Sequence, residues 1–274
     1  MSSRVRRLLR AGLAWDPGRQ SALTRALDRL GADLQSVCRN EEHDVDRNGE
    51  AWLLRRVGQA YPRAILFDVG ANHGSWAECA RREIPEAYVH CFELSPATFA
   101  HLQRNPRLAT GTTLNAFGLG DCAGPVRFNQ VTGLDVLTSV HPVLCAPASQ
   151  VTVADGRMER GDDYCARLSV PEIHLLKCDV EGGEPEVLAG FEGMLSAGRI
   201  AAVQFEYGRV NLVRRFLLAD FYALLGRHGY VVGKLYPGRI AWKTYELDDE
   251  DFVGPNYVAM RPSAIAACRL DDSG

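Results

Sequence analysis

The chain has 274 residues, of which 46% are hydrophobic. Its 31 lysines and arginines against 34 aspartates and glutamates give a formal net charge of -3, so it has no basic field to hold a nucleic acid or an anionic membrane. The longest apolar runs, residues 64–67 and 200–203, fall far short of the roughly 20 residues that span a bilayer. We therefore expect a soluble protein with no nucleic-acid partner and no integral membrane segment.

The cysteines and the N-terminal residues favour a cytoplasmic location. Four arginines lie within the first ten residues, but no apolar segment or small-residue cleavage site follows, so a secretory signal fits poorly. No two cysteines have C-x-x-C spacing, and several lie inside apolar strand-like runs. We interpret all eight as reduced core residues: Cys38, Cys79, Cys91, Cys122, Cys145, Cys165, Cys178 and Cys268.

The first 60 residues read as a helical extension. Residues 19–38 predict an amphipathic helix with Leu23, Ala26, Leu27, Leu30 and Leu34 on one face. The polar stretch 40–49 predicts a linker or a lid, and a second helix over 50–59 should end before Pro62. We expect residues 1–60 to form a helical N-terminal extension or lid and residues 61–274 to form the catalytic domain.

From residue 64 onward, strand-like and helix-like runs alternate. Predicted strands cover residues 64–69, 87–93, 112–117, 173–178, 200–205, 230–235 and 257–260, and predicted helices cover 75–82, 96–104, 184–195 and 212–228. This alternation predicts an α/β fold, Rossmann-like and doubly wound, with a mostly parallel seven-stranded sheet. Residues 129–150 look irregular and too long for an ordinary connection, so we expect them to shape a substrate pocket.

A glycine-containing turn follows the first predicted strand and precedes a helix. It reads Phe67-Asp-Val-Gly-Ala-Asn-His-Gly74, in which Gly70 and Gly74 let the backbone turn tightly and approach a ligand closely. The helix N-terminus beyond it presents unpaired N–H groups. Glu93 ends the next strand, where a carboxylate can accept the two ribose hydroxyls of a nucleoside. Together these features predict a nucleoside-binding crevice.

The amino-acid sequence of the turn indicates which nucleoside binds. A nicotinamide-binding turn reads G-x-G-x-x-G, whereas this one reads G-A-N-H-G after an acid. Asp68 would repel a pyrophosphate, but it suits a cationic ligand such as the methionine part of S-adenosylmethionine. The simpler alternative is a turn that only closes a strand-helix junction, and the presence of both Asp68 and Glu93 argues against it.

Four motifs carry a resemblance to a known family and occur in its order: Asp68-Val-Gly-Ala-Asn-His-Gly74, Phe92-Glu93-Leu-Ser-Pro96, Lys177-Cys-Asp-Val-Glu-Gly-Gly-Glu184 and Phe205-Glu206. From about residue 48 to about residue 260 the chain resembles the FkbM family of S-adenosylmethionine-dependent methyltransferases. The resemblance implies a class I methyltransferase fold and O-methylation of a hydroxyl on a small molecule, natural product, sugar or glycan. Two positions depart from the family pattern: Leu94, and the run Arg160-Gly-Asp-Asp163.

Carried over to this sequence, the resemblance implies a set of donor-binding residues. Glu93 would bind the ribose, Phe117 in the stretch 115–121 would pack near the adenine, and Asn48-Gly-Glu50 resembles the family's lead-in, although an exposed turn is the simpler interpretation. The residues expected on the methionine side are Asp68, Gly70, Asn72 and Gly74, with Asp179 beside them.

Carboxylates at two further strand ends are candidates for the catalytic base. Burial at the end of an apolar strand can shift the pKa of such acids, so we choose Asp179 first and then Glu206. His141, in the irregular middle segment, is the third candidate. Glu184 lies in the first turn of a helix, where capping is the expected role.

Several alternatives stay open. Asp179, Glu181 and Glu206 carry oxygen ligands of the kind that Mg²⁺ prefers, so a magnesium site is a minor alternative, whereas no His/Cys cluster has zinc spacing. N- or C-methylation would use the same fold. A nicotinamide-dependent oxidoreductase and a non-catalytic binding module are the remaining alternatives, since the fold alone does not decide function.

Overall fold

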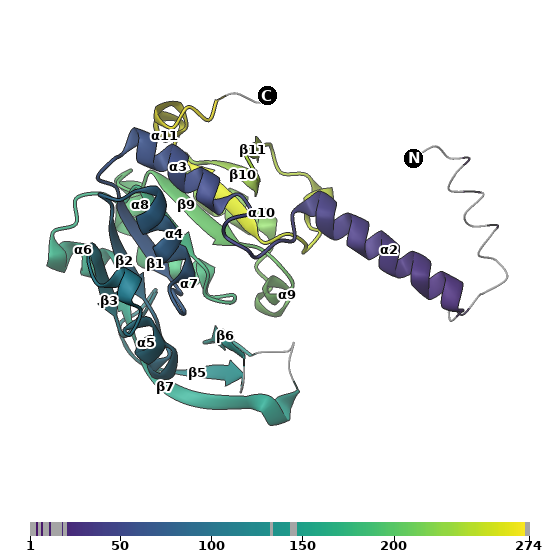
Figure 1. The fold of residues 1–274 in the computed structure, drawn as a ribbon, viewed down its shortest axis with the longest axis horizontal. Helices are drawn as coiled ribbons and strands as arrows, with labels where there is room; N and C mark the ends of the chain where they lie inside the picture. Colours follow the sequence, from purple (N-terminus) through teal and green to yellow (C-terminus); the bar gives the residue numbers. More distant parts are fainter. Residues whose placement is uncertain are drawn as a thin grey trace.

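The computed structural model describes residues 4, 7, 11, 18, 21–131, 134–142 and 147–271. Eight strands form the main sheet in the order β11-β10-β12-β9-β8-β1-β2-β3 (Figure 1). The neighbours β9, β8, β1, β2 and β3 are parallel, whereas the pairs β9–β12, β12–β10 and β10–β11 are antiparallel. The strands are β1 (Ile65–Val69), β2 (Tyr88–Phe92), β3 (Thr112–Asn115), β8 (Leu175–Cys178), β9 (Ala202–Glu206), β10 (Val231–Tyr236), β11 (Arg239–Trp242) and β12 (Asn256–Met260).

The doubly wound α/β prediction is confirmed, but the predicted count of seven strands is wrong. The eighth strand, β11, forms a hairpin with β10 through Pro237 and Gly238. Proline followed by a glycine of positive φ, here 78° at Gly238, is typical of a type II turn. The strand after this turn has only four residues, Arg239–Trp242, and its pairing with β10 depends on the turn.

The chain order reverses next to β1. From β1 the chain runs outward through β2 to β3, and later crosses to the other side to form β8 and then β9. The switch point therefore lies between β1 and β8, whose carboxyl ends are Val69 and Cys178. Ligands of open α/β sheets bind outside the carboxyl ends at such a point, so the topology places the site here.

Helices cover both faces of the sheet, because successive strand residues point to opposite faces. Leu66 packs in one apolar core with α3, α4, α5 and α11, and Phe67 packs in a second core with α6, α7, α8 and α10. The helices of the two layers are α3 (Glu50–Ala60), α4 (Ser75–Glu83), α5 (Pro96–Leu102), α6 (Gly161–Leu168), α7 (Glu184–Gly190), α8 (Glu192–Ser196), α10 (Leu218–Arg227) and α11 (Pro262–Ala267).

Two predicted long helices are each divided in two. The helix expected over 184–195 breaks at Phe191, whose ring is fully buried between α7 and α8. The helix expected over 212–228 is α9 (Val210–Arg214) and α10, separated where Arg215 takes a left-handed φ of 54°. Tertiary packing ends these helices, and their sequence periodicity alone does not reveal the breaks.

Residues 118–160 form a second sheet that the sequence analysis did not predict. Its order is β4-β7-β5-β6, with β4 (Gly118–Gly120), β5 (Gly124–Val131), β6 (Leu134–Ser139) and β7 (Val151–Arg160). The segment 129–150 is therefore largely a strand end, a strand and a 3-10 helix (Ala148–Gln150), and not an irregular loop. Residues 132–133 and 143–146 of this segment lie outside the described residues. These strands were not predicted because they lack the continuous apolar runs that mark the central strands of the main sheet.

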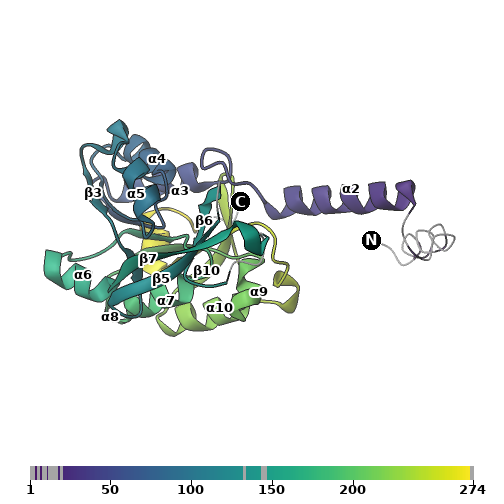
Figure 2. The same ribbon diagram turned by 90° about the horizontal axis from the view of Figure 1, so that it is seen from below.

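Helix α2 (Ala22–Arg39) projects away from the body of the protein, as Figures 1 and 2 show. Its amphipathic pattern is as predicted, but Leu23, Leu27, Leu30 and Leu34 are 41–58% exposed and do not pack on the domain. Within the described part of the chain, no helix is long and apolar enough to cross a membrane.

The described cysteines are all free thiols. Five are buried as expected: Cys79, Cys91, Cys165, Cys178 and Cys268. Cys38 and Cys122 are exposed, so the core assignment is wrong for these two, and Cys145 lies outside the described residues. Cys38 is on the projecting helix α2 and Cys122 follows β4, which explains their exposure.

Candidate functional site

A cavity of about 620 Å³ opens at the carboxyl ends of β1, β2 and β8. Its size is that of a typical small-molecule site. The glycine turn forms one wall: Gly70 has a φ of 88°, and the N–H groups of Gly70 and Ala71 both donate to the Phe92 carbonyl at 3.0 Å. A Cβ at Gly70 would lie 1.8 Å from the Asp179 carbonyl oxygen, so only glycine lets the two strand ends meet.

Glu93 is held in a fixed orientation at the end of β2. Its Oε2 accepts from the Asn72 N–H at 2.9 Å and its Oε1 accepts from the Ser95 N–H at 2.8 Å. Burial raises the pKa of Glu93 to about 6, although these backbone hydrogen bonds oppose the shift. The carboxylate lines the cavity and is tied to the glycine turn, so the two predicted parts of a nucleoside site form one unit.

Four side-chain atoms of residues in the cavity wall are buried without a hydrogen-bond partner among the described residues, and two of them lie at the glycine turn and the helix that follows it. These two are Asn72 Oδ1, in a residue with a left-handed φ of 47°, and Trp76 Nε1, in the first turn of α4. Buried polar groups are nearly always paired in folded proteins. An acceptor and a donor facing the same cavity therefore indicate a polar ligand.

Lys177 lies among acids at the floor of the cavity. Its Nζ lies 2.8 Å from Asp179 Oδ2 and 3.8 Å from Asp68 Oδ1. Burial lowers the pKa of Lys177, but the charges of Asp179 and Asp68 outweigh it and raise the pKa above its ordinary value. Burial raises the pKa of Asp68 to about 6 despite Lys177. Both Asp68 oxygens are buried without a hydrogen bond in the described structure.

Three more acids crowd the same strand ends. Burial raises the pKa of Glu181 to about 8 and that of Glu184 to about 7. Burial, followed by the charge of Asp179, raises the pKa of Glu206 well above its ordinary value. Glu184 Oε1 accepts from the Val180 and Gly182 N–H groups at 3.0 and 3.2 Å, which confirms the predicted capping role. A nearby positive charge favours the ionised form of such acids, so the cluster favours a cationic ligand.

The segment before α3 contributes residues that the sequence analysis expected in an exposed turn. Asn48 and Glu50 are 1% and 5% exposed and line the cavity. Asn48 Oδ1 accepts from the Glu50 N–H at 2.9 Å, and Gln204 on β9 donates to the Glu50 carboxylate. In the sequence, only the resemblance of residues 48–50 to the start of the family's domain pointed to this segment. The contact itself was not predictable, because Gln204 is 154 residues away.

The structure brings most predicted site residues together. Three of them do not line the cavity themselves. Asp68 is fully buried, and Gly74 is flanked by the lining residues His73 and Ser75. Phe117 packs on Phe92, with ring centroids 5.8 Å apart. In its place Gly118, Leu119 and Met158 line that side. The predicted residues that line the cavity are Gly70, Asn72, Glu93, Asp179, Glu181 and Glu206.

His141 does not join the carboxylates. Its Nε2 lies 3.6 Å from Glu186 Oε1, and its backbone is held by Ser139 and Asn129. It lines neither this cavity nor the one beside it. This geometry weakens the prediction that His141 acts as a base, although the neighbouring residues Val140 and Ser139 line the two cavities.

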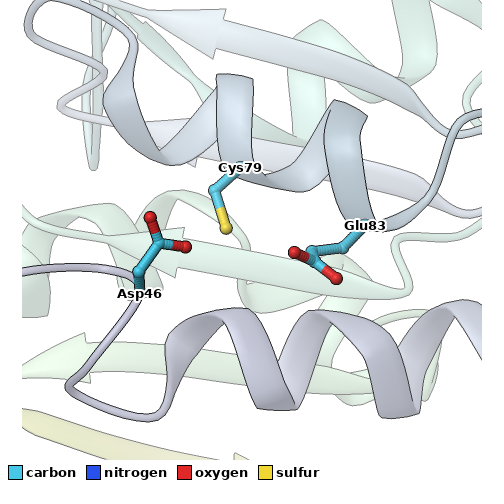
Figure 3. A group of neighbouring side chains, drawn as sticks. All are labelled: Asp46, Cys79 and Glu83. Carbon is cyan, nitrogen blue, oxygen red and sulfur yellow. The ribbon is translucent and has the colours of Figure 1, made fainter.

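Metal-ligand geometry occurs elsewhere in the described structure. One group of three possible ligands, Asp46, Cys79 and Glu83, joins the segment before α3 to α4 (Figure 3). Arg82 contacts all three: it pairs with Asp46 and Glu83, and its Nη2 lies 3.2 Å from Cys79 Sγ. An arginine already neutralises these acids, so the group holds two elements together. The acids proposed for Mg²⁺ do not form such a group within the described residues.

The fold and the cavity define a doubly wound α/β protein that binds its ligand at the topological switch point. The family model described as "Methyltransferase FkbM domain" matches residues 68–232. The chain belongs to this family of methyltransferases, which use S-adenosylmethionine. Membership confirms the resemblance seen in the sequence and sets aside the oxidoreductase alternative.

Curated relatives share modest identity with the chain. It is 29% identical over 205 residues to the 31-O-demethyl-FK506 methyltransferase FkbM of Streptomyces tacrolimicus, covering 65% of this chain and 77% of that protein. It is 29% identical over 170 residues to the hexuronic acid methyltransferase AglP of Haloferax volcanii, covering 60% of this chain and 65% of that protein, which is less than two thirds.

Among solved structures, the O-methyltransferase TomG of Streptomyces achromogenes in complex with SAM superposes with a TM-score of 0.42 at 12% identity. The superposition covers 77% of this chain and 79% of that one. At this TM-score the likeness adds nothing to the assignment, which rests on the family match.

Proposed function

We propose that the cavity at the switch point binds S-adenosylmethionine and that the protein transfers the methyl group to a hydroxyl oxygen of a small molecule, natural product, sugar or glycan. The observation that carries the proposal is the excess of carboxylates around Lys177, because a cationic donor relieves their mutual repulsion. The name of one curated relative, the 31-O-demethyl-FK506 methyltransferase, supports O-methylation, and that of the other, a hexuronic acid methyltransferase, supports an acceptor of the sugar type.

The residues present fit this donor. Asn72 Oδ1 is a buried acceptor that would receive the ammonium group, and the Glu93 carboxylate would accept ribose hydroxyls. Gly118, Leu119 and Met158 form an apolar wall where the adenine would lie. S-adenosylmethionine supplies an electrophilic methyl group on a sulfonium. Asp68 and Asp179 hold Lys177 and keep the local field negative.

The protein's main contribution would be positioning. Methyl transfer needs the acceptor oxygen about 3 to 3.5 Å from the methyl carbon and in line with the bond that breaks. The cavity floor is built from strand ends whose loops interlock at Gly70 and Asp179, so it is rigid. A base that removes the hydroxyl proton adds a factor of roughly 10² to 10⁴.

One experiment tests this function. The protein is incubated with S-adenosylmethionine carrying a labelled methyl group and with a metabolite extract, and the labelled products are identified by mass spectrometry and NMR. We expect label on an ether oxygen. Label on nitrogen or carbon would replace O-methylation by the corresponding alternative. Absence of both label and S-adenosylhomocysteine binding would overturn the donor assignment.

A further inference from the structure

A second cavity, also of about 620 Å³, lies beside the first. The two share His43, Glu181 and Glu206 in their walls. The second cavity lies where β9 ends and α9 begins, so it continues the site past the carboxyl end of a central strand. Two adjoining cavities of similar size suit a reaction with two substrates.

We propose that the second cavity binds the methyl acceptor, an uncharged polyhydroxylated molecule of the glycoside type, and that Glu206 takes the proton from its reacting hydroxyl. The proposal rests on the proposed function above, since it assigns the donor to the first cavity. It goes further by naming the acceptor's place, its chemistry and the proton-accepting residue.

The placement of the carboxylates selects Glu206. Asp179 lines only the first cavity and is paired with Lys177, whereas Glu206 lines both cavities, and no hydrogen bond or ion pair of the described structure engages its carboxylate. Glu181 also lines both, but it sits in a loop with a left-handed φ of 54°. Glu206 ends β9 and is paired in register with Asn256 of β12, and a strand positions a catalytic group more rigidly than a loop does.

The chemistry of the step is simple. The acceptor oxygen forms a bond to the methyl carbon, the carbon–sulfur bond breaks with its electron pair remaining on sulfur, and the hydroxyl proton moves to the Glu206 carboxylate. The charges balance, because a sulfonium and a carboxylate become a neutral thioether and a carboxylic acid. Glu206 lies at the boundary between the two cavities, which is where this proton is released.

The walls of the second cavity indicate the acceptor class. The carboxyl oxygens of Glu181 and Glu206 accept hydrogen bonds from hydroxyl groups. A cationic donor in the first cavity favours their ionised form, which repels an acceptor's own carboxylate or phosphate near the reacting atom. Another part of the wall is apolar, with Val210, Leu212, Val213 and Phe252, and Arg209 also lines the cavity. Tyr207 is fully buried and its hydroxyl is bound to Glu250, so its ring supports this wall from the core. A sugar ring, with hydroxyl edges and C–H faces, matches both parts of the wall.

Gly208 allows the cavity to be filled without straining the backbone. It lines the second cavity, a Cβ there would meet nothing within 4 Å, and its φ is outside the left-handed region. Gly208→Leu should therefore fold and block the cavity. Gly226→Leu is a matched control, because Gly226 also has open space, lies in α10 and lines neither cavity.

The first experiment measures binding. Methyl β-glucoside is the probe for the second cavity, observed by saturation-transfer NMR, and S-adenosylhomocysteine is the probe for the first, observed by calorimetry. We expect the glucoside signal in the wild type and in Gly226→Leu and its loss in Gly208→Leu, with unchanged S-adenosylhomocysteine affinity in all three. Equal glucoside signals in both variants, no signal in the wild type, or a stronger signal from glucuronate would overturn the proposal. Loss of S-adenosylhomocysteine binding in the wild type would overturn the proposed function instead.

The second experiment tests Glu206 with the labelled donor and the extract. Glu206→Gln should lower the maximal rate of label transfer by about 100-fold or more. The affinity for S-adenosylhomocysteine should stay close to that of the wild type, since the shape of the side chain is kept. Label transfer at the wild-type rate would remove Glu206 as the proton acceptor, whatever the first experiment gives.

Discussion

Truncation of Glu93 to alanine tests the donor site and the integrity of the turn together. The carboxylate is 5% exposed and accepts from the Asn72 and Ser95 N–H groups at 2.9 and 2.8 Å. Glu93→Ala leaves both buried donors without an acceptor. Each buried N–H group left without an acceptor costs about 1 to 3 kcal/mol, and removal of a carboxyl whose burial raises its pKa offsets part of this cost. We expect the free energy of unfolding to fall by about 2 to 4 kcal/mol.

The loss depends on pH in a defined direction. The pKa of Glu93 is raised in the folded protein to about 6, so the carboxyl's favourable contribution is fully present below its ordinary value and declines as pH rises through about 6. Glu93→Ala should therefore destabilise the protein more at pH 5 than at pH 8, as urea unfolding at both values would measure.

Donor affinity is the second readout of the same variant. Loss of the ribose-binding carboxylate should weaken S-adenosylmethionine binding by about 1.5 to 3 kcal/mol, a factor of roughly 10 to 150, in calorimetry on the folded fraction. Glu83→Ala is the control: it breaks ion pairs with Arg55 and Arg82 but lines neither cavity, so its donor affinity should match the wild type. A folded Glu93→Ala protein with wild-type affinity would refute the ribose assignment.

Three further outcomes are expected. Gly70→Ala places a Cβ 1.8 Å from a carbonyl at a φ of 88°, so it should lower the free energy of unfolding by about 3 kcal/mol or more in thermal melts; an unchanged melting temperature would contradict this. Lys177→Met leaves Asp68 buried without its cation and should lower the free energy of unfolding by about 3 to 5 kcal/mol. The loss should be smaller at pH 5, because the raised pKa of Asp68 keeps it protonated there, and an equal loss at pH 5 and pH 8 would contradict this. Because the pKa values of Glu181 and Glu184 are raised to about 8 and about 7, the ligand-free protein should lose stability as pH rises through 7 to 8, and urea midpoints that increase over this range would argue against it.

The parts of the site that the sequence predicts are those encoded locally. Gly70 and Asn72 lie within one turn, where glycine and asparagine tolerate left-handed backbone, and Glu93 directly follows a strand-like run. The alternation of apolar runs likewise predicts the parallel strands of the sheet. Each of these signals acts over a few residues, so no knowledge of tertiary contacts is needed to recognise it.

The parts that the sequence does not predict depend on distant contacts. Glu50 enters the cavity because Gln204, on β9, binds its carboxylate. Phe117 does not line the cavity, because its ring packs on Phe92 and Tyr164. Met158 lines the cavity instead, from β7, a strand without an apolar run. The relative merit of Asp179 and Glu206 as bases also emerges only from the partner of each side chain, which the sequence does not specify.

The contact between Glu50 and Gln204 joins residues that the family match leaves out to the sheet that it covers. The family match begins at residue 68, but Leu53, Leu54 and Val57 of α3 are fully buried against the sheet. A chain trimmed to residues 68–232 would lack α3. It would expose the core surface that α3 covers and open one wall of the cavity. The family match is therefore shorter than the part of the chain that folds together, and an expression fragment that keeps the cavity closed must begin before His43.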